Sequence, residues 1–248
     1  ARDLPPKTEI VQNVQMEGAQ RDLYESIRLA MHEKVKAEVD KKGINRAHII
    51  ILDALLKLRQ VCCHPQLLAL PSARKVKQSA KLDLLMDLLP EMIDEGRRVL
   101  LFSQFTSMLA LIEAELVGRK IPYVVLTGKT QDRETPVRRF QEGEVPLFLI
   151  SLKAGGTGLN LTAADTVIHY DPWWNPAVED QATDRAHRIG QAKTVFVYKL
   201  MTVGTVEEKI GEMQSRKREL VEGLLGQDNK SGAKLTAEDI EVLFSPIQ

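Results

Sequence analysis

The chain has 248 residues and carries 34 Lys and Arg side chains against 34 Asp and Glu, so its formal net charge is zero. This length suffices for one large or two small domains with a sizeable core. The neutral balance excludes a global field that would draw the chain onto nucleic acid or a membrane, so any such contact must be local. No apolar run approaches the roughly 20 residues that span a bilayer. We expect no membrane partner and no signal peptide, and the start at Ala1 rather than Met indicates a fragment of a longer protein.

Helical periodicity dominates the first part of the chain. Apolar residues recur at helical spacing over residues 20–40 and again over 46–61, with a break at Gly43. Pro5 and Pro6 precede these patterns and indicate an extended start. We therefore predict an extended segment followed by two helices.

The two cysteines, Cys62 and Cys63, are adjacent and cannot form a disulfide framework, which suits a reducing compartment. His64 follows them, but a structural zinc site needs four ligands and the sequence offers no second cluster of such residues. We predict that both cysteines are packed in the core and that the chain provides no metal site.

Strand and helix patterns alternate after residue 79. A helical pattern over 81–95 comes first. Five aliphatic or β-branched runs then follow, at residues 99–102, 123–126, 147–150, 166–170 and 195–200. Helical patterns over 107–117, 133–141 and 176–187 separate most of them. Runs that are apolar on both faces are typical of parallel strands covered on each side by helices. The predicted fold is therefore α/β, a doubly wound parallel sheet whose ligands bind at the carboxyl ends of the strands.

Two further helical patterns close the chain. Thr205 to Glu208 reads as a capping box that opens a helix through Leu224, and Thr236 to Asp239 opens a short amphipathic helix in the same way. We interpret both helices as packing elements.

Gly128-Lys129-Thr130 looks like the end of a phosphate-binding loop. That loop needs the spacing G-x-x-x-x-G-K-[ST], because its first glycine lets backbone N–H groups surround the phosphates. Tyr123 stands where this glycine should be. We therefore predict a strand-to-helix corner with Thr130 as the N-cap.

Two other segments imitate parts of a nucleotide site. Asp94-Glu95 resembles an acidic magnesium pair, but it ends a helical pattern, with Gly96 as the C-cap, instead of following a strand. Residues 156–161 lack the last glycine of the dinucleotide pattern G-x-G-x-x-G. The chain alone thus lacks a complete nucleotide site.

A glycine-rich loop follows the run at 147–150. Gly155, Gly156 and Gly158 allow a backbone to come close to a ligand, and N–H groups at a helix start bind phosphate. A tight turn without a ligand is the alternative.

The segment 181–191 carries two arginines three residues apart. On a helix, Arg185 and Arg188 would share a face, and Gln181 would join them. Two guanidinium groups aimed the same way bind phosphate oxygens strongly. The alternative is a surface salt bridge, because acidic residues lie nearby at 179, 180 and 184.

Taken together, these segments resemble a known family. The string Q-x-x-x-R-x-H-R-I-G-Q at 181–191 resembles the last helicase motif of the Swi/Snf family of chromatin-remodelling and DNA-translocating ATPases. The glycine-rich loop is similar to that family's fifth motif, and D-P-W-W-N-P at 171–176 matches the usual link between the two. Segments around Ser103 and Thr127 resemble the fourth motif and the segment after it. The resemblance spans nearly the whole chain and is strongest to bacterial members. Thr157 departs mildly from the pattern.

The resemblance implies a second RecA-like lobe. The phosphate loop and the acidic magnesium pair of this family lie on a first lobe, to which nothing here corresponds, so ATP and Mg²⁺ would be bound mainly there. Arg185 and Arg188 would be catalytic arginine fingers. Gln181, Gly156 and Gly158 would contact ATP.

The resemblance also implies a DNA side on this lobe. Its residues would be Ser103, Gln104, Thr127, Gly128, Lys153, Ala154 and Gly155, mostly through hydroxyl and backbone N–H groups to phosphates. Trp174 would couple the DNA groove to the ATP cleft or belong to the core. His187 would be structural.

We expect three regions: a linker and helical protrusion over 1–76, the helicase C-terminal lobe over 77–226, and a tail with a short capping helix over 227–248. The full-length parent would be a DNA-dependent ATPase and translocase, and this fragment alone would be inactive. Its partners would be the first lobe of the same chain, the double-stranded DNA backbone and a protein cargo. The resemblance implies a cytoplasmic or nucleoid location in a bacterium and a nuclear one in a eukaryote.

Two other functions stay open. A strand-separating helicase would usually carry a further arginine in place of Gln191. A non-catalytic interaction module would retain the arginines as a relic, and the absence of a first lobe from the parent would favour it.

Overall fold

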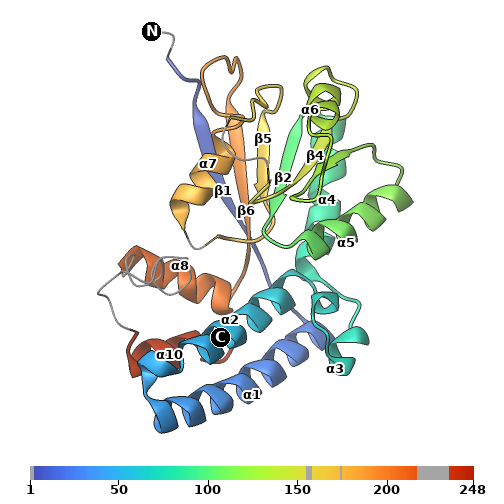
Figure 1. The fold of residues 1–248 in the computed structure, drawn as a ribbon. Coiled ribbons are helices and arrows are strands. Elements are labelled where there is room, and N and C mark those ends of the chain that lie inside the picture. The colour runs from blue at the N-terminus through green and yellow to red at the C-terminus, as the bar shows by residue number, and fades with distance from the viewer. Residues whose placement is uncertain (1–2, 155–157, 174, 217–234) are drawn as a thin grey trace. The chain divides into compact units, whose positions relative to one another are not determined.

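The computed structural model describes residues 3–154, 158–173, 175–216 and 235–248 (Figure 1). Two compact units share the chain. The first, here called the α/β unit, contains Ala1–Gln12 and Leu82–Leu200, and the second, the helical unit, contains Asn13–Lys81 and Met201–Gln248. These two units are not the three regions expected from the sequence, whose limits at 76 and 226 stay a prediction. No described helix is long and apolar enough to cross a bilayer.

A six-stranded sheet forms the centre of the fold, in the order β1-β6-β5-β2-β4-β3. Its strands are β1 Lys7–Val14, β2 Val99–Ser103, β3 Val124–Leu126, β4 Leu147–Ser151, β5 Thr166–His169 and β6 Val195–Thr202. The pairs from β6 to β3 are all parallel. The predicted α/β fold with a parallel sheet is thus confirmed, as are its five apolar strands.

The sequence did not predict β1 as a strand. Most of its side chains are exposed or half-buried, because β1 lies at the edge of the sheet. An edge strand of this kind lacks the apolar run by which buried strands are recognised. The Pro6 carbonyl accepts a hydrogen bond from Val195 N at 3.0 Å, and the Val14 carbonyl accepts one from Val203 N at 2.9 Å. Strands β1 and β6 therefore run in the same direction.

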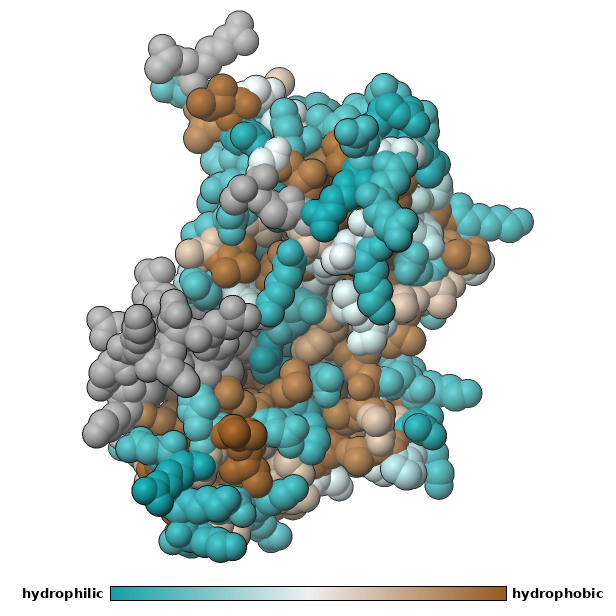
Figure 2. Space-filling model, viewed as in Figure 1, coloured by the Kyte–Doolittle hydropathy of each residue, from teal (hydrophilic) through white to brown (hydrophobic). Residues whose placement is uncertain are grey.

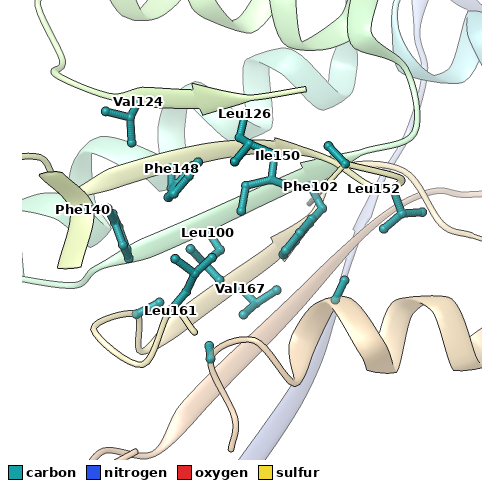
Figure 3. Packing of buried hydrophobic residues seen from close by; sticks show 14 of the residues in the cluster. Leu100, Phe102, Val124, Leu126, Phe140, Phe148, Ile150, Leu152, Leu161 and Val167 are labelled. Atoms are coloured by element: carbon teal, nitrogen blue, oxygen red, sulfur yellow. The ribbon is translucent and has the colours of Figure 1, made fainter. Parts of the chain in front are cut away.

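Helices cover both faces of the sheet, as expected for strands that are apolar throughout. The helices of this unit are α4 Ala80–Asp94, α5 Thr106–Gly118, α6 Glu134–Gln141 and α7 Pro176–Thr183. One face packs with α6 and α7 into a single apolar cluster that includes Phe102, Phe140, Phe148 and Ala182 (Figure 3). Helix α5 packs against β2 and β4 with residues outside that cluster.

Helix α7 ends earlier than its sequence pattern indicates. The pattern extends to residue 187, whereas the helix stops at Thr183 and residues 184–190 form turns. The carbonyl of Arg185 accepts a hydrogen bond from Leu161 N at 2.9 Å instead of continuing the helical ladder. The expectation that Arg185 and Arg188 share a helix face is therefore wrong, because a tertiary contact ends the helix before them.

The corner at Gly128 also differs from the prediction. The Thr130 hydroxyl accepts a hydrogen bond from Thr127 N at 2.9 Å, so it closes a turn and does not cap a helix. Helix α6 begins at Glu134, and Asp132 accepts hydrogen bonds from the backbone N–H groups of Glu134 and Thr135 at 3.1 Å each. The predicted end of α4 is confirmed, because Gly96 follows it with a φ of 83°.

The helical unit is built on two long helices, α1 Gly18–Lys42 and α2 His48–Cys63, which the predicted break at Gly43 separates. Its shorter elements are η1 Ile44–Arg46, η2 Pro65–Leu67, α3 Pro71–Arg74, α8 Val206–Arg216 and α10 Ala237–Leu243. Cys62 and Cys63 are completely buried in it. The predicted capping box at Thr236 is present, and residues 217–224 of the predicted helix lie outside the described residues.

The surface of the helical unit is partly apolar. Figure 2 shows hydrophobic residues gathered on the face of this unit that is turned toward the viewer. Its exposed apolar side chains include Leu29, Ile49 and Leu56. Inside the unit, the Lys81 ammonium lies 2.7 Å from a Glu207 carboxylate oxygen, and both side chains are almost completely buried.

Candidate functional site

A pocket of about 400 Å³ lies beside the turns that follow α7, here called the arginine turn (residues 184–190). Its lining residues are Leu4, Gly158, Leu159, Gln181, Asp184, Arg185, His187, Arg188 and Ile189. Four residues that the sequence assigned to ATP or to catalysis thus meet in one place, although no continuous helix carries the arginines. The arginine turn, and not a helix face, brings these four residues together.

Arg185 is the deeper of the two arginines and is only 7% exposed. Its Nη2 donates a hydrogen bond to the carbonyl of Ala154 at 3.3 Å, and its guanidinium carbon lies 5.6 Å from the centre of the Phe102 ring. Burial lowers the pKa of Arg185. An arginine nevertheless stays charged at neutral pH. The side chain therefore presents a desolvated positive charge next to the glycine-rich loop.

Arg188 is half-buried and lies closer to solvent. Its Nη1 donates a hydrogen bond to the carbonyl of Leu159 at 3.2 Å. Arg188 also lines a second pocket, of about 320 Å³, together with Leu4 and Ile189. The two arginines consequently hold backbone carbonyls on both sides of the glycine-rich loop, at residues 154 and 159.

The centre of this loop, residues 155–157, lies outside the described residues, and the calls on Gly155 and Gly156 with it. Gly158 is described and has a φ of 105°, a backbone conformation that favours glycine. It lines the first pocket. Trp174 also lies outside the described residues.

Gln191 has a role that the sequence did not suggest. Its side-chain amide donates to the carbonyls of Thr162, Ala164 and Ala186 at 3.1, 2.7 and 2.9 Å. One side chain thereby ties the arginine turn to the segment that leads into β5. A further arginine at this position would offer different donor geometry, so the amide suits this particular turn.

The predicted DNA-side residues follow three neighbouring strands. Ser103 ends β2 and Gln104 follows it, Lys153 and Ala154 follow β4, and Thr127 and Gly128 follow β3. Because β2, β4 and β3 are adjacent and parallel, these residues come to one edge of the sheet. Gly128 and Lys153 are exposed, and Gln104 and Thr127 are half-buried.

Two members of this set are turned into the protein. Ser103 is 1% exposed, and its hydroxyl donates a hydrogen bond to Asp171, which also accepts one from Gln104 N at 3.1 Å. Ala154 is 2% exposed. A role for Ser103 at DNA stays a prediction; its observed role is to fix the turn after β2 through Asp171. Sequence reasoning missed this aspartate, and the signal that could have found it is its position directly after the apolar run at 166–170.

A second buried carboxylate holds the same segment. Glu179 accepts a hydrogen bond from Trp173 N at 2.8 Å and pairs with the Lys199 ammonium at 3.1 Å. Burial alone lowers the pKa of Lys199, but the charge and hydrogen bond of Glu179 raise it above its usual value. The carboxylate of Glu179, one of the acidic residues near the arginines in the sequence, thus pairs with Lys199.

Comparison with known proteins agrees with this geometry. Residues 80–190 match the helicase conserved C-terminal domain, and residues 1–67 match the SNF2-related domain. The parallel sheet, with an arginine-lined pocket beside the glycine-rich loop, is thus the C-terminal lobe of a helicase-type protein.

Solved structures and a relative define the family. The chain is 30% identical to the SWI2/SNF2 ATPase C-terminal domain of Sulfolobus solfataricus. The match covers 97% of this chain and 99% of that domain, with a TM-score of 0.73. The ATPase core of the same organism in complex with dsDNA gives 33% identity, coverage of 99% and 51%, and a TM-score of 0.78. An uncharacterized ATP-dependent helicase of Mycoplasma pneumoniae is 37% identical over 98% of this chain and 23% of its own length. The chain belongs to the SWI2/SNF2 family, as its motifs predicted.

The chain spans about a quarter of the length of the curated relatives it matches, between 23% and 27% for the first three.

Proposed function

We propose that this chain is the second lobe of an ATP-dependent double-stranded DNA translocase. In the full-length parent it would supply Arg185 and Arg188 to ATP held mainly by a first lobe. The observation that carries the proposal is that both arginines, Gln181 and Gly158 line one pocket. The similarity to an ATPase core in complex with dsDNA supports DNA as the second ligand.

Arg188 has the environment that a finger needs. A neutral carbonyl now accepts its hydrogen bond, and a phosphate oxygen would add to that bond the attraction between opposite charges. Exchange of the Leu159 carbonyl for a phosphate oxygen is therefore favourable. Fingers of this kind are worth about 10³–10⁵ in turnover elsewhere. Arg185 would add positive charge from a site with little water, where electrostatic effects are larger.

Magnesium is assigned to the first lobe on the family resemblance. The acidic magnesium pair and the phosphate loop of this family lie there, so the ion would neutralise charge on the phosphates from that lobe. The residues of this lobe would act from the opposite side.

The DNA side would bind phosphates without reading sequence. Lys153 and Gly128 are exposed at the edge formed by β2, β4 and β3. Contacts of this type fix the position of a protein on a duplex but carry no sequence information. With a net charge of zero, the chain must rely on such local groups.

Arg188→Ala in the full-length parent tests the finger. We expect ATP binding to stay nearly intact and DNA-stimulated turnover to fall by about 10³ or more, because the lost charge acts in the transition state. Binding of a fluorescent ATP analogue and phosphate release measure the two effects. Arg119→Ala removes an arginine that pairs with Glu115 on exposed helix surface and is the matched control. Near-normal turnover of Arg188→Ala would show that the assignment is wrong.

A further inference from the structure

His187, between the two arginines, contacts the start of the described chain. Its Nε2 donates a hydrogen bond to the carbonyl of Pro5 at 2.8 Å, across 182 positions of sequence. The sequence pattern gave His187 only a structural role within its own helix. The observed contact instead joins the arginine turn to a distant segment, residues 4–6, here called the proline segment.

The proline segment is stiff and is held at two consecutive carbonyls. Proline fixes φ near −65°, and a residue before proline is restricted to extended conformations, so Leu4, Pro5 and Pro6 have little freedom. Pro5 O is bound by His187, and Pro6 O accepts a hydrogen bond from Val195 N in β6 at 3.0 Å. A displacement of this segment is therefore passed on to its partners instead of being absorbed by it.

The same segment forms part of the pocket wall. Leu4 lines both pockets that contain Arg188, and Pro5 lines the second. The proline segment thus lines the pocket and is also hydrogen-bonded to the arginine turn. Leu4 is 50% exposed and Ile189 84% exposed, so two exposed apolar side chains form part of the wall that Arg188 also lines.

We infer that His187 is a positioning residue that fastens the proline segment to the arginine turn. Movement of the part of the parent that precedes residue 4 then reaches Arg185 and Arg188 through one hydrogen bond. The inference rests on the proposed function, because it gives a mechanical route from the first lobe to the arginines that the proposal requires.

Variants of His187 in the full-length parent test the donor. His187→Gln keeps an N–H donor at similar reach, His187→Asn carries a donor that is too short, and His187→Phe keeps a ring without a donor. We expect His187→Phe and His187→Asn to lower DNA-stimulated kcat by roughly tenfold to a hundredfold, the cost of a misplaced catalytic group. KM for ATP should change little, and His187→Gln should recover most of the loss. Equal turnover in all three variants would overturn the inference.

A double change distinguishes the link from loss of stability. Pro5→Gly with Pro6→Gly keeps the accepting carbonyl but removes the stiffness, so we expect the same fall in kcat. Combined with His187→Phe, it should cause no further loss, because both changes break one link. Multiplied losses would overturn the inference, as would a fall in thermal midpoint that explains the activity. Arg188→Ala reports separately on the proposed function. If this variant keeps its turnover, the assignment of Arg188 as an arginine finger is wrong, whatever the His187 variants show.

Discussion

Two buried carboxylates and one buried histidine organise the carboxyl edge of the sheet. Asp171 fixes the turn after β2, and Glu179 fixes the backbone at Trp173. His169, at the end of β5, lies 3.1 Å from the Thr183 hydroxyl and stacks on Phe102 with ring centres 5.6 Å apart. These residues touch no predicted ligand, yet they set the positions of loops that the proposed function requires.

The burial of His169 leads to a prediction about how the stability of the fold depends on pH. Burial lowers its pKa from 6.5 to about 3, so below pH 6.5 the unfolded chain binds a proton that the folded chain does not. Stability should therefore fall as pH drops from 6.5 toward 3, by up to about 1.4 kcal/mol per pH unit. Urea unfolding at pH 6 and pH 4.5 should show a loss of about 2 kcal/mol that His169→Leu lacks. His48→Leu is the control, and an equal loss in both variants would contradict the assignment.

The elements of the helical unit depend on a buried ion pair. Lys81, at the start of α4, contacts Glu207 of α8, and Glu207 also accepts hydrogen bonds from Thr202 N and its hydroxyl at 3.0 and 2.7 Å. Breaking such a pair is costly because a charge stays in a medium of low polarity, although the intact pair adds little net stability. The pair therefore links the start of α4 to α8.

Glu207→Gln tests this arrangement at the scale of the element. We expect the free energy of unfolding to fall by about 3–5 kcal/mol, because the Lys81 ammonium loses its carboxylate partner. Glu208→Gln is a matched control, since Glu208 is half-buried and accepts one long hydrogen bond, from Gly204 N at 3.3 Å. Urea unfolding of the 248-residue chain measures both. A similar, small loss in the two variants would show that the pair is not critical.

At the scale of the whole molecule, the proposed function makes this chain one half of a divided site. The arginine-lined pocket has donors for phosphate, but the described residues offer neither a complete phosphate loop nor a metal cluster. Two compact units without a strong net charge also give little reason for tight DNA binding by this chain alone. Activity should therefore require the full-length parent.

The isolated 248-residue chain should fold but hydrolyse no ATP, with or without DNA. Phosphate release from the chain and from the parent, measured side by side, checks this expectation. Any DNA binding by the chain should be weak and should decrease with salt, because it depends on phosphate contacts that release counterions. DNA-stimulated ATP turnover by the chain alone would contradict a divided site. DNA binding that does not change with salt concentration would contradict the proposed phosphate contacts.

Sequence patterns were reliable where local structure and burial agree. The five apolar strands, the helices around them and the breaks at Gly43 and Gly96 follow from periodicity and glycine placement. The family followed from motif strings at 100–105, 151–161 and 181–191. Each of these signals is local, because it depends on side chains within a few positions of one another.

Contacts between distant segments decided the rest. Leu161 ends α7 before Arg185, so the arginines meet the glycine-rich loop through turns and not through a helix face. His187 reaches Pro5 across 182 positions, and Asp171 withdraws the Ser103 hydroxyl from the surface. No local pattern encodes these contacts, because the backbone carbonyl of every residue type can accept a hydrogen bond. Only the packed chain selects which carbonyl each side chain meets.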